Sequence, residues 1–279
     1  MLRLAVLVCA LCSSHALLFS TSGGLWNNLK VTWGLNPFSS STFVGMPRTE
    51  TQAISQGFKK ISSCSTTGTF RGNRYVKGND YAVVLLYDVK GYIAGIQASI
   101  PGNQTDGFPK HRSDKIFVKD GDRYTITAYF VDPSTICTTG RSAAQFSSHG
   151  TGTNLYIQKD ENPEASTMIP HQETNVKKVS EWTEGKCFLT MGKHYWHSLT
   201  KDKNMDCNKM LPVFLLYNGG ELNGFGWAMN TNLGSPRYEH PTKTSIPSFM
   251  HTVPTCLLNA QHLSTMHIYF TTHVELDLC

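Results

Sequence analysis

The sequence has no long apolar run. No stretch approaches the roughly 20 consecutive apolar residues that a membrane-spanning helix needs. Long blocks of basic residues are also missing, because the 25 Lys and Arg residues are dispersed among 20 Asp and Glu residues. Short basic pairs such as Lys59-Lys60 and Lys177-Lys178 are typical of solvated surface. We therefore predict no membrane span and no nucleic-acid partner.

The motifs of several common enzyme classes are absent as well. The chain contains no G-x-S-x-G, H-E-x-x-H, Walker, G-x-G-x-x-G or EF-hand pattern. Each of these patterns places a nucleophile, a metal ligand or a phosphate cradle at a fixed spacing. Their absence favours a protein without catalytic activity, although it does not by itself exclude an enzyme.

The first sixteen residues have the form of a secretory signal. Arg3 precedes the apolar stretch Leu4–Leu11, and the small residues Ser14 and Ala16 stand where signal peptidase requires them. We predict that residues 1–16 are removed and that the protein is secreted and extracellular. Downstream, Asn103-Gln104-Thr105 is an N-glycosylation sequon in a Pro/Gly/Asn-rich segment, which predicts a glycan on Asn103 in an exposed loop.

Six of the eight cysteines remain after the predicted cleavage. An even number in an exported chain favours disulfides over a metal or redox site. Spacing alone leaves the connectivity open. The six are Cys64, Cys137, Cys187, Cys207, Cys256 and Cys279.

Two predicted hairpins have similar sequences, VVLLYDVKGYIAG at Val83–Gly95 and VFLLYNGGELNG at Val213–Gly224. Other landmarks recur around them in the same order, and the first two, Pro47 with Cys64 and Pro170 with Cys187, are equally spaced. The pattern indicates a tandem duplication. The alternative is that generic hairpin chemistry produced the likeness. The later landmarks are Gly72–Tyr75 with Gly192–Tyr195, Tyr129-Phe130 with Tyr269-Phe270, and Cys137 with Cys279.

The matched landmarks predict the boundaries of the repeat units and the pairing of the cysteines. We predict a first repeat unit with an N-terminal extension over residues 17–137, a linker over 138–161 and a second repeat unit over 162–279. The linker is polar and contains one strand-like piece at Asn154–Gln158. Equivalent cysteines then pair alike, and the unmatched cysteines form an additional cross-link. The predicted bonds are Cys64–Cys137, Cys187–Cys279 and Cys207–Cys256.

Local patterns predict one helix and several strands in each unit. Thr49-Glu50-Thr51-Gln52 has the form of a capping box, which predicts a helix over Glu50–Ile61, with a counterpart over Glu173–Trp182. The apolar runs Tyr81–Tyr87 and Leu211–Tyr217 predict buried strands, and alternation predicts closing strands that end at Phe130 and Phe270. The predicted fold class is α+β and predominantly antiparallel β. Each repeat is a helix packed on a small antiparallel sheet, and the two units either stand apart or merge about a pseudo-two-fold axis.

Histidine is concentrated in the second unit, which holds eight of the eleven residues. His194, His197 and His267 are the candidate metal ligands, for zinc or for copper with nearby methionines. The plainer alternative is that they are ordinary strand and loop residues. In an extended strand, positions three apart point to opposite faces, so His194 and His197 bind one ion only if the chain turns locally. Because a site more often arises where duplicated units differ, we expect any site in the second unit.

These observations favour a secreted, disulfide-linked extracellular binding, inhibitory or matrix protein without catalytic activity and without a cofactor. Its expected partner is an extracellular protein or a glycan. The alternative is a secreted zinc- or copper-dependent enzyme that uses the histidines of the second repeat. The sequence does not identify the ligand.

Overall fold

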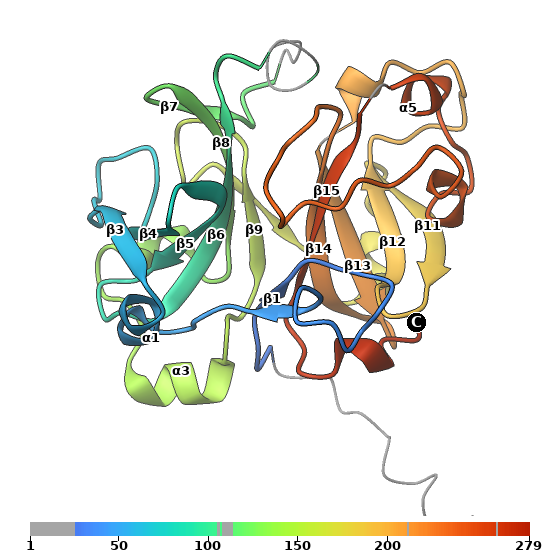
Figure 1. The fold of residues 1–279 in the computed structure, drawn as a ribbon. Helices are drawn as coiled ribbons and strands as arrows, with labels where there is room; N and C mark the ends of the chain where they lie inside the picture. The colour runs from blue at the N-terminus through green and yellow to red at the C-terminus, as the bar shows by residue number, and fades with distance from the viewer. Residues whose placement is uncertain (1–25, 105–106, 108–113, 211, 261) are drawn as a thin grey trace, which may run out of the picture.

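The computed structural model describes residues 26–104, 107, 114–210, 212–260 and 262–279. The predicted signal peptide, residues 1–16, and Thr105 of the sequon lie outside the described residues. Two antiparallel sheets stand side by side, and the helices are short and peripheral (Figure 1). The predicted antiparallel β character is therefore confirmed, while helix contributes less than the sequence patterns suggest.

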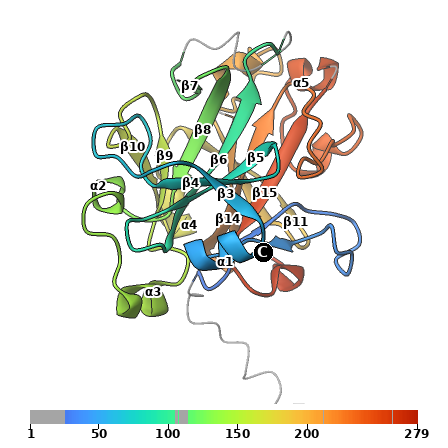
Figure 2. The same ribbon diagram turned by 60° about the vertical axis from the view of Figure 1, so that its left-hand side comes forward.

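The first sheet has eight strands, and Figure 2 turns it toward the viewer. Along the sheet the order is β10-β9-β8-β6-β5-β4-β3, and β7 pairs with β8. Apart from β7, strands that follow one another in sequence therefore lie next to each other as a meander. The strands are β3 (Phe58–Ser62), β4 (Asn73–Lys77), β5 (Asp80–Tyr87), β6 (Ile93–Pro101), β7 (Val118–Asp120), β8 (Arg123–Tyr129), β9 (Leu155–Gln158) and β10 (Ser166–Ile169).

The second sheet has seven strands in the order β11-β12-β13-β14-β15-β1-β2. The strands are β11 (Trp182–Phe188), β12 (Gly192–His197), β13 (Val213–Asn218), β14 (Glu221–Met229), β15 (Ser264–Tyr269), β1 (Lys30–Val31) and β2 (Val44–Gly45).

We call the chain up to Cys137 the first half and the chain from Thr138 onward the second half. Each half contributes its leading strands to the sheet formed mainly by the other half. β1 and β2 precede the first meander in sequence, yet β1 pairs with β15 of the second sheet. β9 and β10 precede the second meander, yet β9 pairs with β8 of the first sheet. The segment predicted as a linker thus contributes a strand, as expected for Asn154–Gln158, and the two halves are bound together by reciprocal strand exchange.

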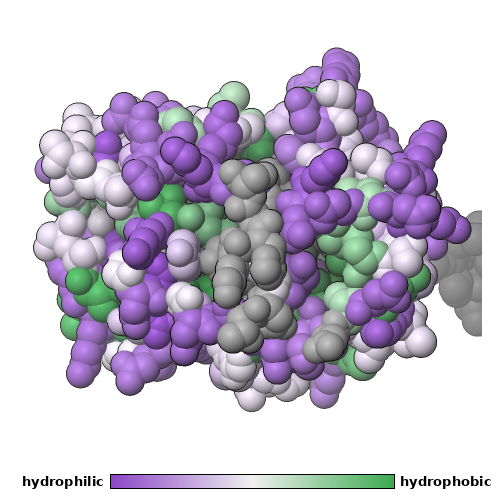
Figure 3. Space-filling view, turned by 90° about the horizontal axis from the view of Figure 1, so that it is seen from above, coloured by the Kyte–Doolittle hydropathy of each residue, from purple (hydrophilic) through white to green (hydrophobic). Residues whose placement is uncertain are grey.

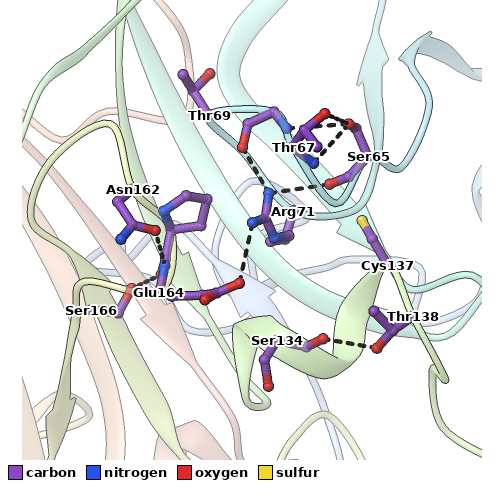
Figure 4. Close-up of polar contacts among 12 residues, drawn as sticks. Ser65, Thr67, Thr69, Arg71, Ser134, Cys137, Thr138, Asn162, Glu164 and Ser166 are labelled. Atoms are coloured by element: carbon purple, nitrogen blue, oxygen red, sulfur yellow. Dashed lines mark hydrogen bonds and ion pairs between the residues drawn. The ribbon is translucent and has the colours of Figure 1, made fainter.

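Figure 4 shows how the second of these leading segments is held on the first sheet. The buried guanidinium of Arg71 forms an ion pair with Glu164 at 3.3 Å. The same group donates hydrogen bonds to the carbonyls of Ser65 and Gly68. Gln158 at the end of β9 adds a bond to the carbonyl of Thr69 at 2.8 Å. These bonds fix the entry to β10 against the 65–71 loop.

One apolar core fills the space between the two sheets. Alternate residues of the strands that face it come from both halves, as the alternating pattern of the closing strands predicts. Phe130 lies within ring-contact distance of both Phe225 and Phe270, at centroid separations of 6.4 and 5.2 Å. Because the core is shared, neither half buries its inner face alone.

The predicted long helices are wrong. α1 covers only Glu50–Ser55, although the capping box between Thr49 and Gln52 is present as expected. Gly57 takes a positive φ of 85°, and β3 begins at the next residue, so the chain turns where the pattern predicted helix to Ile61. The other elements are α2 (Pro133–Ile136), α3 (Ala143–His149), α4 (Glu173–Val176), α5 (Thr255–Asn259), and the 3-10 turns η1 (Cys207–Lys209), η2 (Ile246–Ser248) and η3 (Val274–Leu276).

The expected helix at Glu173–Trp182 is likewise reduced to the single turn of α4. Its apolar residues are nevertheless buried, since Val176 is fully covered and Trp182 is only 8% exposed as the first residue of β11. The spacing of those residues identified a buried face correctly. A single helical turn followed by a strand buries the same residues without a continuous helix.

Matching contacts recur at the landmarks shared by the halves. The hydroxyl of Tyr87 donates to the carbonyl of Pro47 at 2.8 Å, and that of Tyr217 donates to the carbonyl of Pro170 at 2.5 Å. In each half the tyrosine at the end of the hairpin strand thereby fixes the proline that precedes the first helical turn. Further matching contacts are Tyr75 with Glu50, Tyr195 with Glu173, Glu50 N–H with the Gly91 carbonyl, and Glu173 N–H with the Gly220 carbonyl.

Three disulfides join the cysteines in the same pairs that the matched landmarks predict. The first and second close loops in the two halves, and the third lies wholly in the second half. They are Cys64–Cys137, Cys187–Cys279 and Cys207–Cys256.

Candidate functional site

A pocket of about 350 Å³ lies on the outer face of the second sheet, the face turned away from the shared core. Strand alternation produces it. Tyr195 and Leu215 point into the shared core, so their strand neighbours Trp196 and Phe214 point outward. The pocket-lining residues of strands β12 to β15 are His194, Trp196, Phe214, Ala228, Thr265 and His267, and β11 adds Phe188.

Small residues on β14 leave room in the floor of the pocket. Ala228 lines it, and Gly226 beside it has no side chain. A Cβ on Gly226 would stand 2.1 Å from the ring of Phe214 and 2.6 Å from the carbonyl oxygen of Met266. The absence of a Cβ at Gly226 therefore leaves the space that the ring of Phe214 occupies in the pocket lining.

Two segments that have no strand role cover this face. One follows β12 and contains Met210 and η1, and the other runs from Glu239 to Leu263 and contains Ile246, Phe249 and α5. The Cys207–Cys256 disulfide joins the two segments across the apolar cluster. The additional cross-link of the second half is thus part of the cover of the pocket.

Glu239 and His267 form a buried pair at the pocket wall. The carboxylate oxygen Oε2 of Glu239 lies 3.1 Å from Nδ1 of His267, and these side chains are 13% and 7% exposed. A short bridge between the backbones of Glu239 and Thr265 holds the acid beside β15. The other ring nitrogen of His267, Nε2, is buried and has no hydrogen-bond partner among the described residues.

His194 lies next to this pair in an aromatic environment. Its ring centroid is 6.0 Å from that of His267 and 5.6 Å from that of Phe214. Its Nδ1 lies 3.2 Å from the carbonyl oxygen of Lys186, so Nδ1–H donates to that oxygen in the neutral ring. Complete burial, and secondarily the neighbouring His267, lowers the pKa of His194 to about 3. His194 is therefore neutral at physiological pH.

The structure brings together two of the three predicted metal ligands and separates the third. His197 lies on the opposite face of β12 from His194, and its ring contacts Trp182 at a centroid distance of 4.9 Å. The strand is extended there, so the local turn that joint coordination required is missing. Across the described residues, no three His, Cys, Asp or Glu side chains come close enough together to hold a metal ion.

Sequence reasoning did not identify Glu239. It lies in a loop, distant in sequence from His267, and no motif marks it. The available signal was its position beside His240 in the half of the chain where histidines are concentrated. Only the pairing of that loop with β15 shows that the acid contacts a histidine.

Asn103, the predicted glycosylation site, is exposed in the turn that follows β6. None of the helices in the described part of the chain has the length and apolar composition that crossing a bilayer requires. The chain matches no protein-family model, no curated protein and no solved structure at a significant level. The geometry of the site is therefore the basis for a functional assignment.

Proposed function

We propose that this chain is a secreted, disulfide-linked binding protein, and that its site is the pocket on the second sheet. The observation that carries the proposal is a largely apolar cavity lined by His267, whose ring nitrogen Nε2 is buried and has no hydrogen-bond partner among the described residues. Small-molecule sites have this composition, with an apolar lining and a few polar groups that fix orientation. We assign the protein no catalytic step.

The dimensions of the pocket indicate a small ligand. Its volume of about 350 Å³ lies at the lower end of the range of roughly 300–1,000 Å³ found for small-molecule sites. An engineered cavity of about 150 Å³ binds benzene. The pocket therefore accommodates a substituted aromatic ring or a bicyclic compound, enclosed by Trp196, Phe214 and Phe249.

An apolar ligand suits the lining better than a glycan or a peptide. A sugar has many hydroxyl groups, and each one that is buried without a partner costs free energy. On the end of the molecule shown in Figure 3, apolar residues of the described part are interspersed with hydrophilic ones.

A pocket-filling substitution tests the proposal. Propylbenzene is added to the purified protein, and saturation transfer from protein to ligand is measured by NMR. Ala228→Leu places extra methyl groups in the cavity and is expected to abolish the transfer. Ala144→Leu makes the same change on the exposed surface of α3 and is the matched control. Absence of transfer in the wild type, or equal transfer in Ala228→Leu, would refute the proposal.

Secretion and glycosylation form part of the same proposal. Three disulfides and an exposed Asn103 support it. Expression in eukaryotic cells is expected to yield protein in the medium whose first residue is Leu17. Its mass should fall after removal of N-linked glycans, and Asn103→Gln should eliminate that fall.

We also propose that the two halves descend from one duplicated segment. The recurring Tyr–Pro hydrogen bonds, the two equivalent disulfides and the reciprocal strand exchange support this origin. In this history the pocket is an acquisition of the second half. The metal-enzyme alternative has weaker support, because His197 lies on the opposite face of the sheet from the other two candidate ligands.

A further inference from the structure

The hydrogen bonds of Glu239 determine which nitrogen of His267 carries a proton. Oε1 accepts from the backbone N–H of Trp33 at 2.7 Å, and Oε2 accepts from the hydroxyl of Thr265 at 2.8 Å. Nδ1 of His267 is the next neighbour of Oε2, at 3.1 Å. An ionised carboxylate only accepts hydrogen bonds, so Nδ1 must be the protonated nitrogen.

The remaining nitrogen then has a defined role. In a neutral imidazole with the proton on Nδ1, Nε2 is an acceptor with a free lone pair. The ring cannot rotate freely, because it lies near the rings of Phe214 and Tyr269, at centroid distances of 4.9 and 5.9 Å. Nε2 is buried, and no described protein group bonds to it. A buried acceptor in this position favours a ligand that brings a donor.

We propose that Nε2 of His267 accepts a hydrogen bond from the ligand, and that the ligand is therefore a small, uncharged alcohol or phenol with an apolar body. This inference rests on the proposed function and names the class of ligand for the same pocket. Ethers and ketones of the same shape lack the donor. Carboxylates bring a negative charge close to the carboxylate of Glu239 in an apolar environment, which is unfavourable.

A matched pair of probes tests the ligand class. 4-Propylphenol and 4-propylanisole have the same apolar body, but only the phenol has a hydroxyl donor. Their dissociation constants are measured by isothermal titration calorimetry at pH 8. The wild type is expected to bind the phenol about tenfold more tightly, which is the usual cost of leaving one buried acceptor unpaired.

Two substitutions separate hydrogen-bond acceptance from packing. His267→Phe keeps an aromatic ring and removes the acceptor, so the two probes should bind within about twofold of each other, as expected without that one hydrogen bond. Glu239→Gln still accepts from Trp33, but its amide donates to Nδ1 and moves the imidazole proton to Nε2. The anisole should then bind more tightly than it does to the wild type. His251→Phe, at an exposed position outside the pocket, is the control and should retain the wild-type ratio.

The outcomes distinguish the two proposals. Failure of both probes to bind the folded wild-type protein would overturn the proposed function and this inference with it. Equal binding of the two probes, or tighter binding of 4-propylanisole, would overturn the inference and leave the pocket as a site for apolar ligands. An unchanged preference in Glu239→Gln would overturn the assignment of the proton to Nδ1. Thermal unfolding of each variant verifies that it is folded.

Discussion

The protonation of His194 predicts how stability depends on pH. Burial lowers the pKa of this residue from 6.5 to about 3 in the folded protein, whereas in the unfolded chain the ring is solvated. The unfolded state therefore binds a proton more readily as pH falls below 6.5. The stability contributed by the neutral ring is present in full above that pH and is lost as pH falls toward 3.

The size of the effect follows from the width of this window. One pKa unit corresponds to about 1.36 kcal/mol, so acidification from pH 8 to pH 4.5 costs about 2.7 kcal/mol through His194 alone. His194→Phe removes the titration and keeps the aromatic packing against Trp196 and Phe214. It also removes the hydrogen bond to the carbonyl of Lys186, at a cost of about 1 kcal/mol.

These values predict a reversal in the order of stability. At pH 8, His194→Phe should be about 1 kcal/mol less stable than the wild type, and at pH 4.5 it should be about 1.7 kcal/mol more stable. Urea unfolding followed by tryptophan fluorescence measures both free energies. Met250→Leu alters the same apolar cluster without changing a titratable group, so its stability should parallel that of the wild type. Parallel curves for His194→Phe and the wild type would refute a neutral, buried His194.

Three other perturbations have defined expectations. Replacing Cys187 and Cys279 together by Ala opens a loop with a sequence separation of 92 residues and should cost about 4–5 kcal/mol in reversible unfolding. Burial raises the pKa of Asp277 to about 7, so the free energy of unfolding should fall by up to about 4 kcal/mol through this group as pH rises from 4 to 7. Asp277→Asn should remove this pH dependence, as measured by unfolding curves recorded at several pH values. Gly226→Ala should cost about 1–3 kcal/mol in chemical denaturation by displacing the ring beneath the pocket, whereas Gly45→Ala, with open space around its Cβ, should cost less.

The disulfide pairs were predictable because the same landmarks recur in the same order along the sequence. The matched positions of Cys64 and Cys187, and of Cys137 and Cys279, reduced many possible connectivities to one. The hairpin strands were predictable for a related reason, since a buried strand that ends at Asp or Asn beside glycine has a strong local signature. Both inferences depend on short segments whose own residues determine their structure.

Pairing between distant strands was not predictable in the same way. β1 and β2 contain two residues each, too few for a periodic pattern, and their place beside β15 depends on tertiary packing. The helix predictions failed because an i, i+3 spacing of apolar residues also fits a turn that leads into a strand. Gly57 was the sequence signal for the end of the helix, because glycine readily adopts the positive φ that follows α1, even though the apolar spacing continues beyond it.

The difference between the two halves explains why only the second contains the described pocket. At the places of His194, Gly226 and His267, the first half has Arg74, Gln97 and Thr127, as the matched strand registers show.

In the first half these polar side chains bond to one another. Arg74 Nε donates to Gln97 at 2.8 Å, and the Gln97 amide donates to Thr127 at 2.9 Å. Asp120 of β7 forms an ion pair with Arg74. The outer face of the first sheet is thus occupied by a buried polar network whose members satisfy each other.

The corresponding positions of the second half hold less side-chain volume in the middle of the face. Gly226 has no side chain where the first half has Gln97, and the imidazole of His194 is shorter than the guanidinium of Arg74, whereas His267 is larger than Thr127. The second half also has fewer polar groups at these positions, and His267, which lines the apolar pocket, has a buried Nε2 without a hydrogen-bond partner among the described residues. Under the proposed function, a ligand in the pocket of the second half takes the volume, and supplies the hydrogen bond, that the first half provides from its own side chains.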